Sequence, residues 1–284
     1  MVKLSLEKKR KIALLLLIPL LVGTVVVSFE PDGRTKSPLY IPILMYHEIR
    51  PEPEQWGHDT VSPDKFRSDL SVLRQYGYSP IFFKDIDRAR RGGARLPDKP
   101  VLITIDDGYY STYEWAYPIL KEMNAKATVS IIGWSVGREY HKDGVTPITR
   151  HFTWEQGKEM YDSGVVDIQC HSFDLHNQSD SEHGAAPYAK ESETDYAGRF
   201  TADTLRIKGL IEERIGNEAI VYTYPYGIYN STAESVIRHL GFKFSLTVDS
   251  GVSDLSDSPF LLKRMNVPYY LSSLDLIRAM ERAM

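Results

Sequence analysis

Two short segments of this chain contain two carboxylates and two imidazoles that could act together. The first reads Thr-Ile-Asp-Asp-Gly at 104–108 and contains Asp106 and Asp107, and the second, roughly sixty residues later, begins at His171 and ends at His176. A divalent ion such as Zn²⁺ binds His nitrogen and Asp oxygen, and it lowers the pKa of a bound water to roughly 7. Together the two segments predict metal-assisted hydrolysis.

Each segment follows a predicted β-strand. Residues 101–105 form a continuous apolar, β-branched run that stops at Asp-Asp-Gly, which is typical of a buried parallel strand ending in a tight turn. Residues 165–170 predict a second strand, after a helix that begins with Thr153 as N-cap and ends at Gly164. We therefore expect His171 at the end of that strand.

The spacing of the two histidines limits how they could meet at one ion. Five residues apart, they would lie roughly 140° apart on a helix and on opposite faces of a strand. Only a strand end followed by a bent loop brings both to one point. An Asp-Asp-Gly turn or a histidine pair alone is more often structural. Here the turn and the histidine pair each lie at the end of a predicted strand in an alternating β/α chain. Strand ends are where such folds carry their chemistry.

Apolar runs that alternate with helical patterns predict the fold. The expected strands are at 41–46, 78–83, 101–105, 127–132, 165–170, 219–224, 242–248 and 260–267. Between the first two, Ser62 and Pro63 open a helix whose Phe66, Leu70 and Leu73 share one face. The alternation predicts an α/β chain folded as a parallel, TIM-like (β/α) barrel.

The beginning of the chain predicts a membrane anchor. Basic residues at 8–11 precede an uncharged stretch, 12–29, whose eighteen residues are about the minimum for a membrane-spanning helix. We expect 1–11 to be a cytoplasmic basic segment and 12–29 an uncleaved signal anchor, with a cleaved signal peptide as the alternative. Residues 30–38 are then a linker, and 39–284 form one domain on the extracytoplasmic side of the cell membrane.

Charge and cysteine content limit which ligands the domain at 39–284 can bind and what its cysteine can do. Seven of the 34 Lys/Arg and three of the 38 Asp/Glu lie in residues 1–38, which leaves the remainder with a formal net charge of −8. This argues against nucleic acid or anionic lipid as the ligand of that domain, whereas a neutral glycan is compatible. The single cysteine, Cys170, cannot form an internal disulfide and is expected to pack in the core rather than bind metal.

Three motifs resemble those of the polysaccharide deacetylase family, also called the NodB-homology domain or carbohydrate esterase family 4. They are Thr-Ile-Asp-Asp-Gly-Tyr-Tyr-Ser at 104–111, the His-Ser-x-x-x-His loop, and Tyr-Pro-Tyr-Gly at 224–227. The resemblance runs from about Tyr40 to the C-terminus. The opening Ile-Leu-Met-Tyr-His at 43–47 and the longer histidine spacing resemble the branch that deacetylates poly-β-1,6-N-acetylglucosamine. The resemblance implies a distorted or incomplete barrel.

The resemblance also implies a role for each motif residue. Asp107, His171 and His176 would bind a divalent metal, with zinc expected and nickel or cobalt as alternatives, and Asp106 would be the general base. The backbone N–H of Tyr226 would stabilise the oxyanion formed when water attacks an acetamide carbonyl.

The sequence departs from the common family pattern in two places. The late strand at 260–267 has no histidine, so we expect His47 to be the general acid, the alternative being a strand-end imidazole without a chemical role. Thr223 occupies the place of an arginine that would orient Asp106. Arg264 is the candidate replacement, because a guanidinium pairs bidentately with a carboxylate; an ordinary surface ion pair is the alternative.

Several residues near the motifs have two interpretations. Asp174 is either a partner of a metal-binding histidine or a loop cap, and the polar stretch 177–195 is either a substrate-facing loop or a surface excursion. Aromatic residues near the motifs could stack on sugars, although most aromatics only pack. These residues are Tyr109, Tyr110, Trp134, Tyr226 and Tyr229.

Two classes of function are compatible with these motifs. The first is a membrane-anchored, metal-dependent N-deacetylase of N-acetylglucosamine-containing biofilm or cell-wall polysaccharide, with O-acetyl esterase action on acetylated polysaccharide as a variant. The second is a non-catalytic glycan-binding protein on the same fold. Because all four motif residues, Asp106, Asp107, His171 and His176, are present, the sequence favours the enzyme.

Overall fold

The computed structural model describes residues 38–52, 57–178 and 183–284, which belong to one compact unit. All eight predicted strands are present. Their bounds are β1 (Ile43–Tyr46), β4 (Ser79–Ile81), β5 (Pro100–Ile105), β6 (Ala127–Ile132), β7 (Val166–Ser172), β8 (Val221–Thr223), β9 (Phe244–Ser250) and β10 (Leu262–Asn266). Two short strands that the sequence did not predict, β2 (Glu48–Ile49) and β3 (Thr60–Val61), pair with each other.

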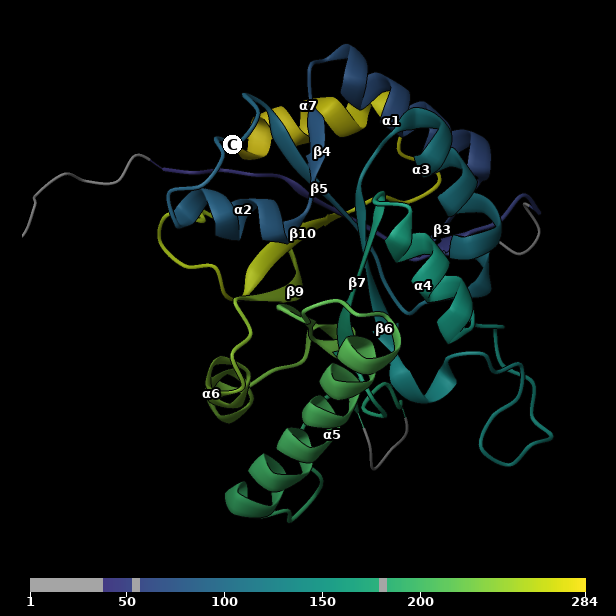
Figure 1. The fold of residues 1–284 in the computed structure, drawn as a ribbon, viewed down its shortest axis with the longest axis vertical. Coiled ribbons are helices and arrows are strands. Elements are labelled where there is room, and N and C mark those ends of the chain that lie inside the picture. Colours follow the sequence, from purple (N-terminus) through teal and green to yellow (C-terminus); the bar gives the residue numbers. More distant parts are fainter. Residues whose placement is uncertain (1–37, 53–56, 179–182) are drawn as a thin grey trace, which may run out of the picture. The chain divides into compact units, whose positions relative to one another are not determined.

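Seven of these strands close into a parallel barrel (Figure 1). The order is β1, β10, β9, β8, β7, β6 and β5, and β5 pairs back onto β1. The remaining strand, β4, pairs with the first half of β5 and lies outside this ring. Leu102 of β5 thus has Ile81 of β4 on one side and Ile43 of β1 on the other. The prediction of a distorted or incomplete (β/α) barrel is therefore confirmed.

Helices cover the barrel and follow the predicted sequence signals. In the first, the Ser62 side chain caps the helix, and Phe66, Leu70 and Leu73 are buried as expected. In the fourth, Thr153 and Gln156 form a reciprocal capping box. The helices are α1 (Pro63–Gln75), α2 (Phe83–Arg90), α3 (Tyr117–Met123), α4 (Trp154–Asp162), α5 (Glu193–Arg214), α6 (Ser231–His239) and α7 (Ser273–Ala283).

Helix α2 closes the amino-terminal end of the barrel. Its Phe83 and Ile86 belong to a buried apolar cluster with residues of β1, β5, β8, β9 and β10. On its polar side, Lys84 pairs with Asp167 at the start of β7, at 2.9 Å. Apolar packing and this ion pair therefore hold α2 over the amino-terminal end, whereas the carboxyl ends of the strands form the face where such barrels carry their chemistry.

The predicted anchor at 12–29 lies outside the described residues. Within residues 38–52, 57–178 and 183–284, none of the helices combines the length and the apolar character needed to cross a bilayer.

Candidate metal and catalytic site

The turn after β5 sends two adjacent carboxylates to different partners. Asp107 has a positive φ of 73°, which is uncommon for a residue other than glycine, and Gly108 follows with φ 82°. A side chain at Gly108 would be strained by this φ, and its Cβ would lie 3.0 Å from the Ile131 side chain. The sharp bend lets Asp106 point toward β10 while Asp107 points toward the two histidines.

Asp107, His171 and His176 form a cluster with the composition and size of a metal site. Asp107 Oδ1 lies 3.3 Å from Nε2 of His171 and 3.3 Å from Nε2 of His176. The three ligand atoms lie within 4.8 Å of one another. Asp107 Oδ1 is buried, yet among the described residues it accepts no hydrogen bond. One carboxylate and two imidazoles around an unsatisfied buried oxygen fit a divalent cation such as zinc.

A β-bulge presents His171 to this cluster. Cys170 pairs with Ile131 of β6, whereas Ser172 pairs with Ile132, so His171 is an extra residue in β7. A bend after the strand then brings His176 within a 4.9 Å ring-centroid distance of His171. The structure thus contains the strand end and bent loop that the five-residue spacing requires.

Contacts behind each histidine orient its ring. Nδ1 of His171 lies 2.7 Å from the carbonyl oxygen of Thr223, so a proton on Nδ1 leaves the Nε2 lone pair facing Asp107. Nδ1 of His176 lies 3.2 Å from the Tyr226 hydroxyl. Burial lowers the pKa of His176 to about 4, which keeps this imidazole neutral near pH 7.

The two imidazoles and Asp107 affect one another's ionisation. Burial alone would raise the pKa of Asp107, but His171 and His176 outweigh it and hold that pKa far below its usual value. Burial would likewise lower the pKa of His171, but Asp107 and Asp106 outweigh it and raise that pKa. Asp107 is therefore ionised, as a metal ligand must be, and a metal would displace the proton from His171.

Asp174 is not the partner of a metal-binding histidine. Its carboxylate pairs with Lys142, and within the described ranges it contacts neither imidazole. The interpretation that favoured such a role is wrong, because the loop turns the Asp174 side chain outward, where it remains about a third exposed.

Arg264 takes the place of the arginine that the third motif lacks. Its Nη1 donates to Oδ1 of Asp106 at 2.9 Å, and its Nη2 lies 2.8 Å from Oδ2. Arg264 is fully buried, so the alternative of a surface ion pair is wrong. Its Nε also donates to the Thr247 carbonyl oxygen at 2.7 Å, and Nη1 to the Thr104 hydroxyl at 3.2 Å. These contacts fix the guanidinium beside the carboxylate of Asp106, to which it donates one hydrogen bond from Nη1.

Arg264 also sets the charge of Asp106. Burial alone would raise the pKa of Asp106, but the positive charge of Arg264, followed by the charges of His171 and His47, outweighs it, and the pKa falls below its usual value. Asp106 is therefore ionised at neutral pH, as a proton acceptor must be.

His47 and Tyr226 lie in the same cavity as these residues. Nε2 of His47 is 3.9 Å from Oδ2 of Asp106, and the His47 side chain is 19% exposed, so the imidazole can reach a ligand. Tyr226 has a positive φ of 55° in the turn after β8. The cavity has a volume of about 480 Å³, and its lining includes both residues together with Asp106, Asp107, His171, His176 and Arg264.

Two further residues near the site have no local signal in the sequence. Asp203 of α5 accepts hydrogen bonds from the backbone N–H groups of Phe173 (2.8 Å) and Asp174 (2.7 Å), and so clamps the loop between the histidines. His151 is buried against the ring of Tyr109, at 5.0 Å between centroids. Sequence reasoning missed both, because each acts on a segment far away in the chain.

The described part of the segment 177–195 packs against the third motif. The ring of His183 lies 5.6 Å from that of Tyr226, and a Cβ on Gly184 would lie 2.9 Å from the carbonyl oxygen of Pro225. This contact favours the interpretation as a site-facing loop over a surface excursion.

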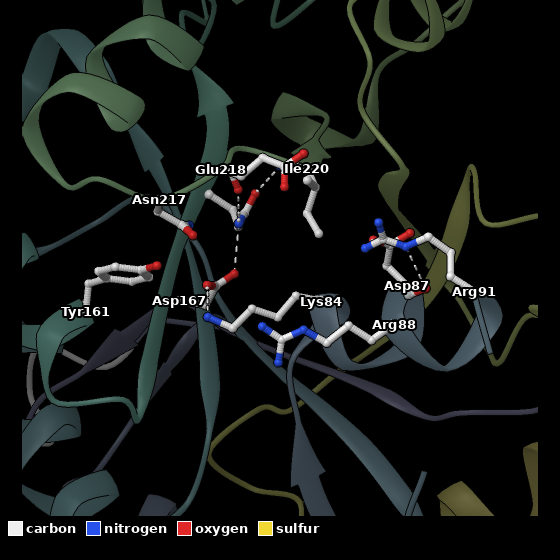
Figure 2. A pocket seen from close by; sticks show the side chains of 10 residues that line it. Lys84, Asp87, Arg88, Arg91, Tyr161, Asp167, Asn217, Glu218 and Ile220 are labelled. Atoms are coloured by element: carbon white, nitrogen blue, oxygen red, sulfur yellow. Dashed lines mark hydrogen bonds and ion pairs between the residues drawn. The ribbon is translucent and has the colours of Figure 1, made fainter. Parts of the chain in front are cut away.

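A second cavity, of about 260 Å³, lies at the opposite end of the barrel (Figure 2). Four of its charged side chains form two pairs, Lys84 with Asp167 and Arg91 with Asp87. Asp167 also accepts a hydrogen bond from Gln169 at 2.8 Å. Polar residues at the start of barrel strands typically serve stability, and here the Lys84–Asp167 pair joins α2 to β7.

Fold and site together define a parallel α/β barrel with a candidate Asp-His-His metal centre at the carboxyl ends of its strands. The family model for polysaccharide deacetylase matches residues 93–245. The chain belongs to the polysaccharide deacetylase family.

Three similar proteins illustrate the relationship. YxkH of Bacillus subtilis strain 168 is 30% identical over 235 residues, which cover 82% of this chain and 74% of YxkH. The poly-β-1,6-N-acetyl-D-glucosamine N-deacetylase of Escherichia coli K12 is 26% identical over 75% of this chain but only 34% of its own length. The structure of IcaB from Ammonifex degensii superposes with a TM-score of 0.70 at 28% identity, covering 85% of this chain and 97% of IcaB.

Proposed function

We propose that this protein is a metal-dependent hydrolase that removes N-acetyl groups from N-acetylglucosamine-containing polysaccharide. Family membership supports deacetylation, and the name of the E. coli relative supports an N-acetylglucosamine polymer as substrate. The observation that carries the proposal is the division of the two carboxylates. Asp107 faces two imidazoles, and Asp106 faces a buried arginine and His47 in the same cavity.

The residues of the site supply the steps that amide hydrolysis needs. A bound divalent ion would acidify water and polarise the acetyl carbonyl. Asp106, ionised beside Arg264, accepts the proton of the attacking water at Oδ2. The backbone N–H of Tyr226 donates to the oxyanion. His47, whose Nε2 lies 3.9 Å from Oδ2 of Asp106, donates a proton from Nε2 to the departing amine, which cannot leave as an anion.

Product analysis tests this proposal. The purified full-length protein would be loaded with Zn²⁺, Ni²⁺ or Co²⁺ and incubated with β-1,6- and β-1,4-linked N-acetylglucosamine oligomers and with O-acetylated xylan. We expect acetate release with free amines on the N-acetylglucosamine oligomers. Release from the O-acetylated glycan alone would identify an esterase instead, and no release with any metal would contradict hydrolysis.

We also propose that the catalytic domain lies outside the cytoplasm, held by the uncharged segment 12–29. The support is the basic cluster that precedes this segment, since such clusters remain on the cytoplasmic side. Protease treatment of intact cells should digest the domain while the protein fractionates with membranes. A soluble product that begins near Glu30 would instead indicate a cleaved signal peptide.

A further inference from the structure

A cluster of aromatic and polar side chains lies where β10 ends and β3 begins. The hydroxyl of Tyr270 lies 3.4 Å from Nε2 of His58, and the amide nitrogen of Asn266 lies 3.3 Å from Nδ1 of His58. The same amide donates to Oδ1 of Asp59 at 3.3 Å. These contacts join residues more than two hundred positions apart in the sequence.

Two tyrosine rings of this cluster face solvent. Tyr270 is 65% exposed and Tyr269 is 46% exposed, and their rings meet edge to face at 5.3 Å. The His58 ring makes a second edge contact with Tyr270, at 6.1 Å. We call His58, Tyr269 and Tyr270 the tyrosine platform. Its rings are supported on their edges by one another, so a face of Tyr270 can be offered to a ligand at little cost in side-chain entropy.

The platform adjoins the catalytic cavity. Asp59, bonded to Asn266, also lines the cavity that contains Asp106, Asp107 and His47. A ligand unit on the platform would therefore lie next to a unit whose acetyl group is in the cavity. Tyr270 does not line the cavity itself, but its contacts through His58 and Asn266 lead to Asp59, which does. Tyr76, which is 40% exposed at the C-terminal end of α1, serves as the comparison.

We propose that the tyrosine platform binds a sugar unit of the polysaccharide adjacent to the unit being deacetylated. This inference rests on the proposed function. A pyranose has an apolar face of C–H groups that stacks on an aromatic ring, and hydroxyl groups at its rim that Asn266 and Asp59 can bind. An exposed aromatic surface beside a cavity is typical of an extended ligand groove. The platform makes the enzyme selective for oligomers over single sugars.

Chain-length dependence tests the platform. Kinetics of the metal-loaded, full-length protein would be measured on N-acetylglucosamine oligomers of increasing length and on an aryl acetate too small to reach Tyr270. For Tyr270→Ala we expect kcat/KM on long oligomers to fall about three- to tenfold, mainly through KM, with the aryl acetate unchanged. Tyr270→Phe should retain the ring and most of the activity, and Tyr76→Ala should behave as wild type.

The controls separate this inference from the proposed function. If the wild-type protein releases no acetate from any N-acetylglucosamine oligomer, the proposed function fails. If the wild type is active and Tyr270→Ala keeps the full preference for long oligomers, the platform is wrong while the function stands. If Trp115→Ala lowers kcat/KM on long oligomers and Tyr270→Ala does not, the polymer lies over the neighbouring cavity that Trp115 lines. That result would also overturn the platform.

Discussion

Arg264 and Asp106 form a buried, hydrogen-bonded ion pair across 158 residues of sequence. The pair couples the last strand of the barrel to the turn that carries both carboxylates. Removing one member of a buried pair costs about 3–5 kcal/mol, because the other charge is left without compensation. Replacing Arg264 should therefore change both the free energy of unfolding and the pKa of Asp106.

Replacing the arginine should change the pH dependence of activity. In Arg264→Met the pKa of Asp106 should rise, so the base becomes ionised only at higher pH and the acid limb of kcat/KM moves upward. Arg264→Lys should shift this limb less. The double variant with Asp106→Asn should be more stable to urea than Arg264→Met alone. An unchanged acid limb in Arg264→Met would show that the arginine does not act through Asp106.

Removing a proposed metal ligand should remove metal and activity together. We expect this for Asp107→Ala, His171→Ala and His176→Ala, measured by elemental analysis of each folded variant. Asp106→Asn should keep the metal but lose about 10²–10⁴-fold in turnover, because it lacks the base. Any of the three alanine variants that keeps both metal content and rate would exclude that residue from the site.

Replacing His47 should affect amides more than activated esters. His47→Ala should lower turnover of an N-acetylglucosamine oligomer by about 10²–10⁴-fold, because the amine needs a proton to depart. An aryl acetate expels a phenolate without such help, so its turnover should fall much less. Metal content, measured in parallel, should not change. Equal losses on both substrates would assign His47 to binding or structure.

Weakening the clamp on the histidine loop should lower metal affinity. The two carboxylate oxygens of Asp203 each accept a hydrogen bond from one backbone N–H of the loop. Asp203→Asn replaces one of these oxygens with an N–H₂ group, so the loop loses one hydrogen bond. We expect metal affinity to fall about tenfold, as for other residues that orient ligands indirectly. Asp195→Asn, in the first turn of the same helix, is the matched control, because its carboxylate accepts a hydrogen bond from the Ser192 hydroxyl and not from the histidine loop; this variant should bind metal normally. Competition with a chelator measures both variants.

The buried His151 should make the fold sensitive to acid. Burial lowers its pKa to about 4, so the unfolded chain binds a proton more readily than the folded one. The contribution of the neutral imidazole to the free energy of unfolding is complete above pH 6.5 and is lost as the pH falls toward 4. This loss amounts to at most about 3 kcal/mol. His151→Phe should lose less stability over this range than wild type, whereas His239→Gln, at an exposed position, should match it. Identical pH dependence in all three would contradict this assignment.

Local signals in the sequence determined the elements and the chemistry of the first motif. Apolar runs marked all eight strands of the main sheet, and the Asp-Asp-Gly turn placed Asp106 and Asp107 at the end of one of them. The caps of α1 and α4 were also predictable, since a cap depends on residues three positions apart. Periodicity and turn chemistry depend on residues only a few positions apart, so they can be recognised from a single sequence.

The tertiary structure alone decided which distant residues meet. Strand periodicity does not encode that β1 lies beside β10, or that β4 lies outside the ring, and only closure of the barrel brings Arg264 to Asp106. The bulge that presents His171 arises from the pairing of β7 with β6. The clamp by Asp203 requires α5 to pack against the histidine loop. Each of these contacts depends on non-local packing, whose free energy is shared over the whole barrel and leaves no local pattern in the chain.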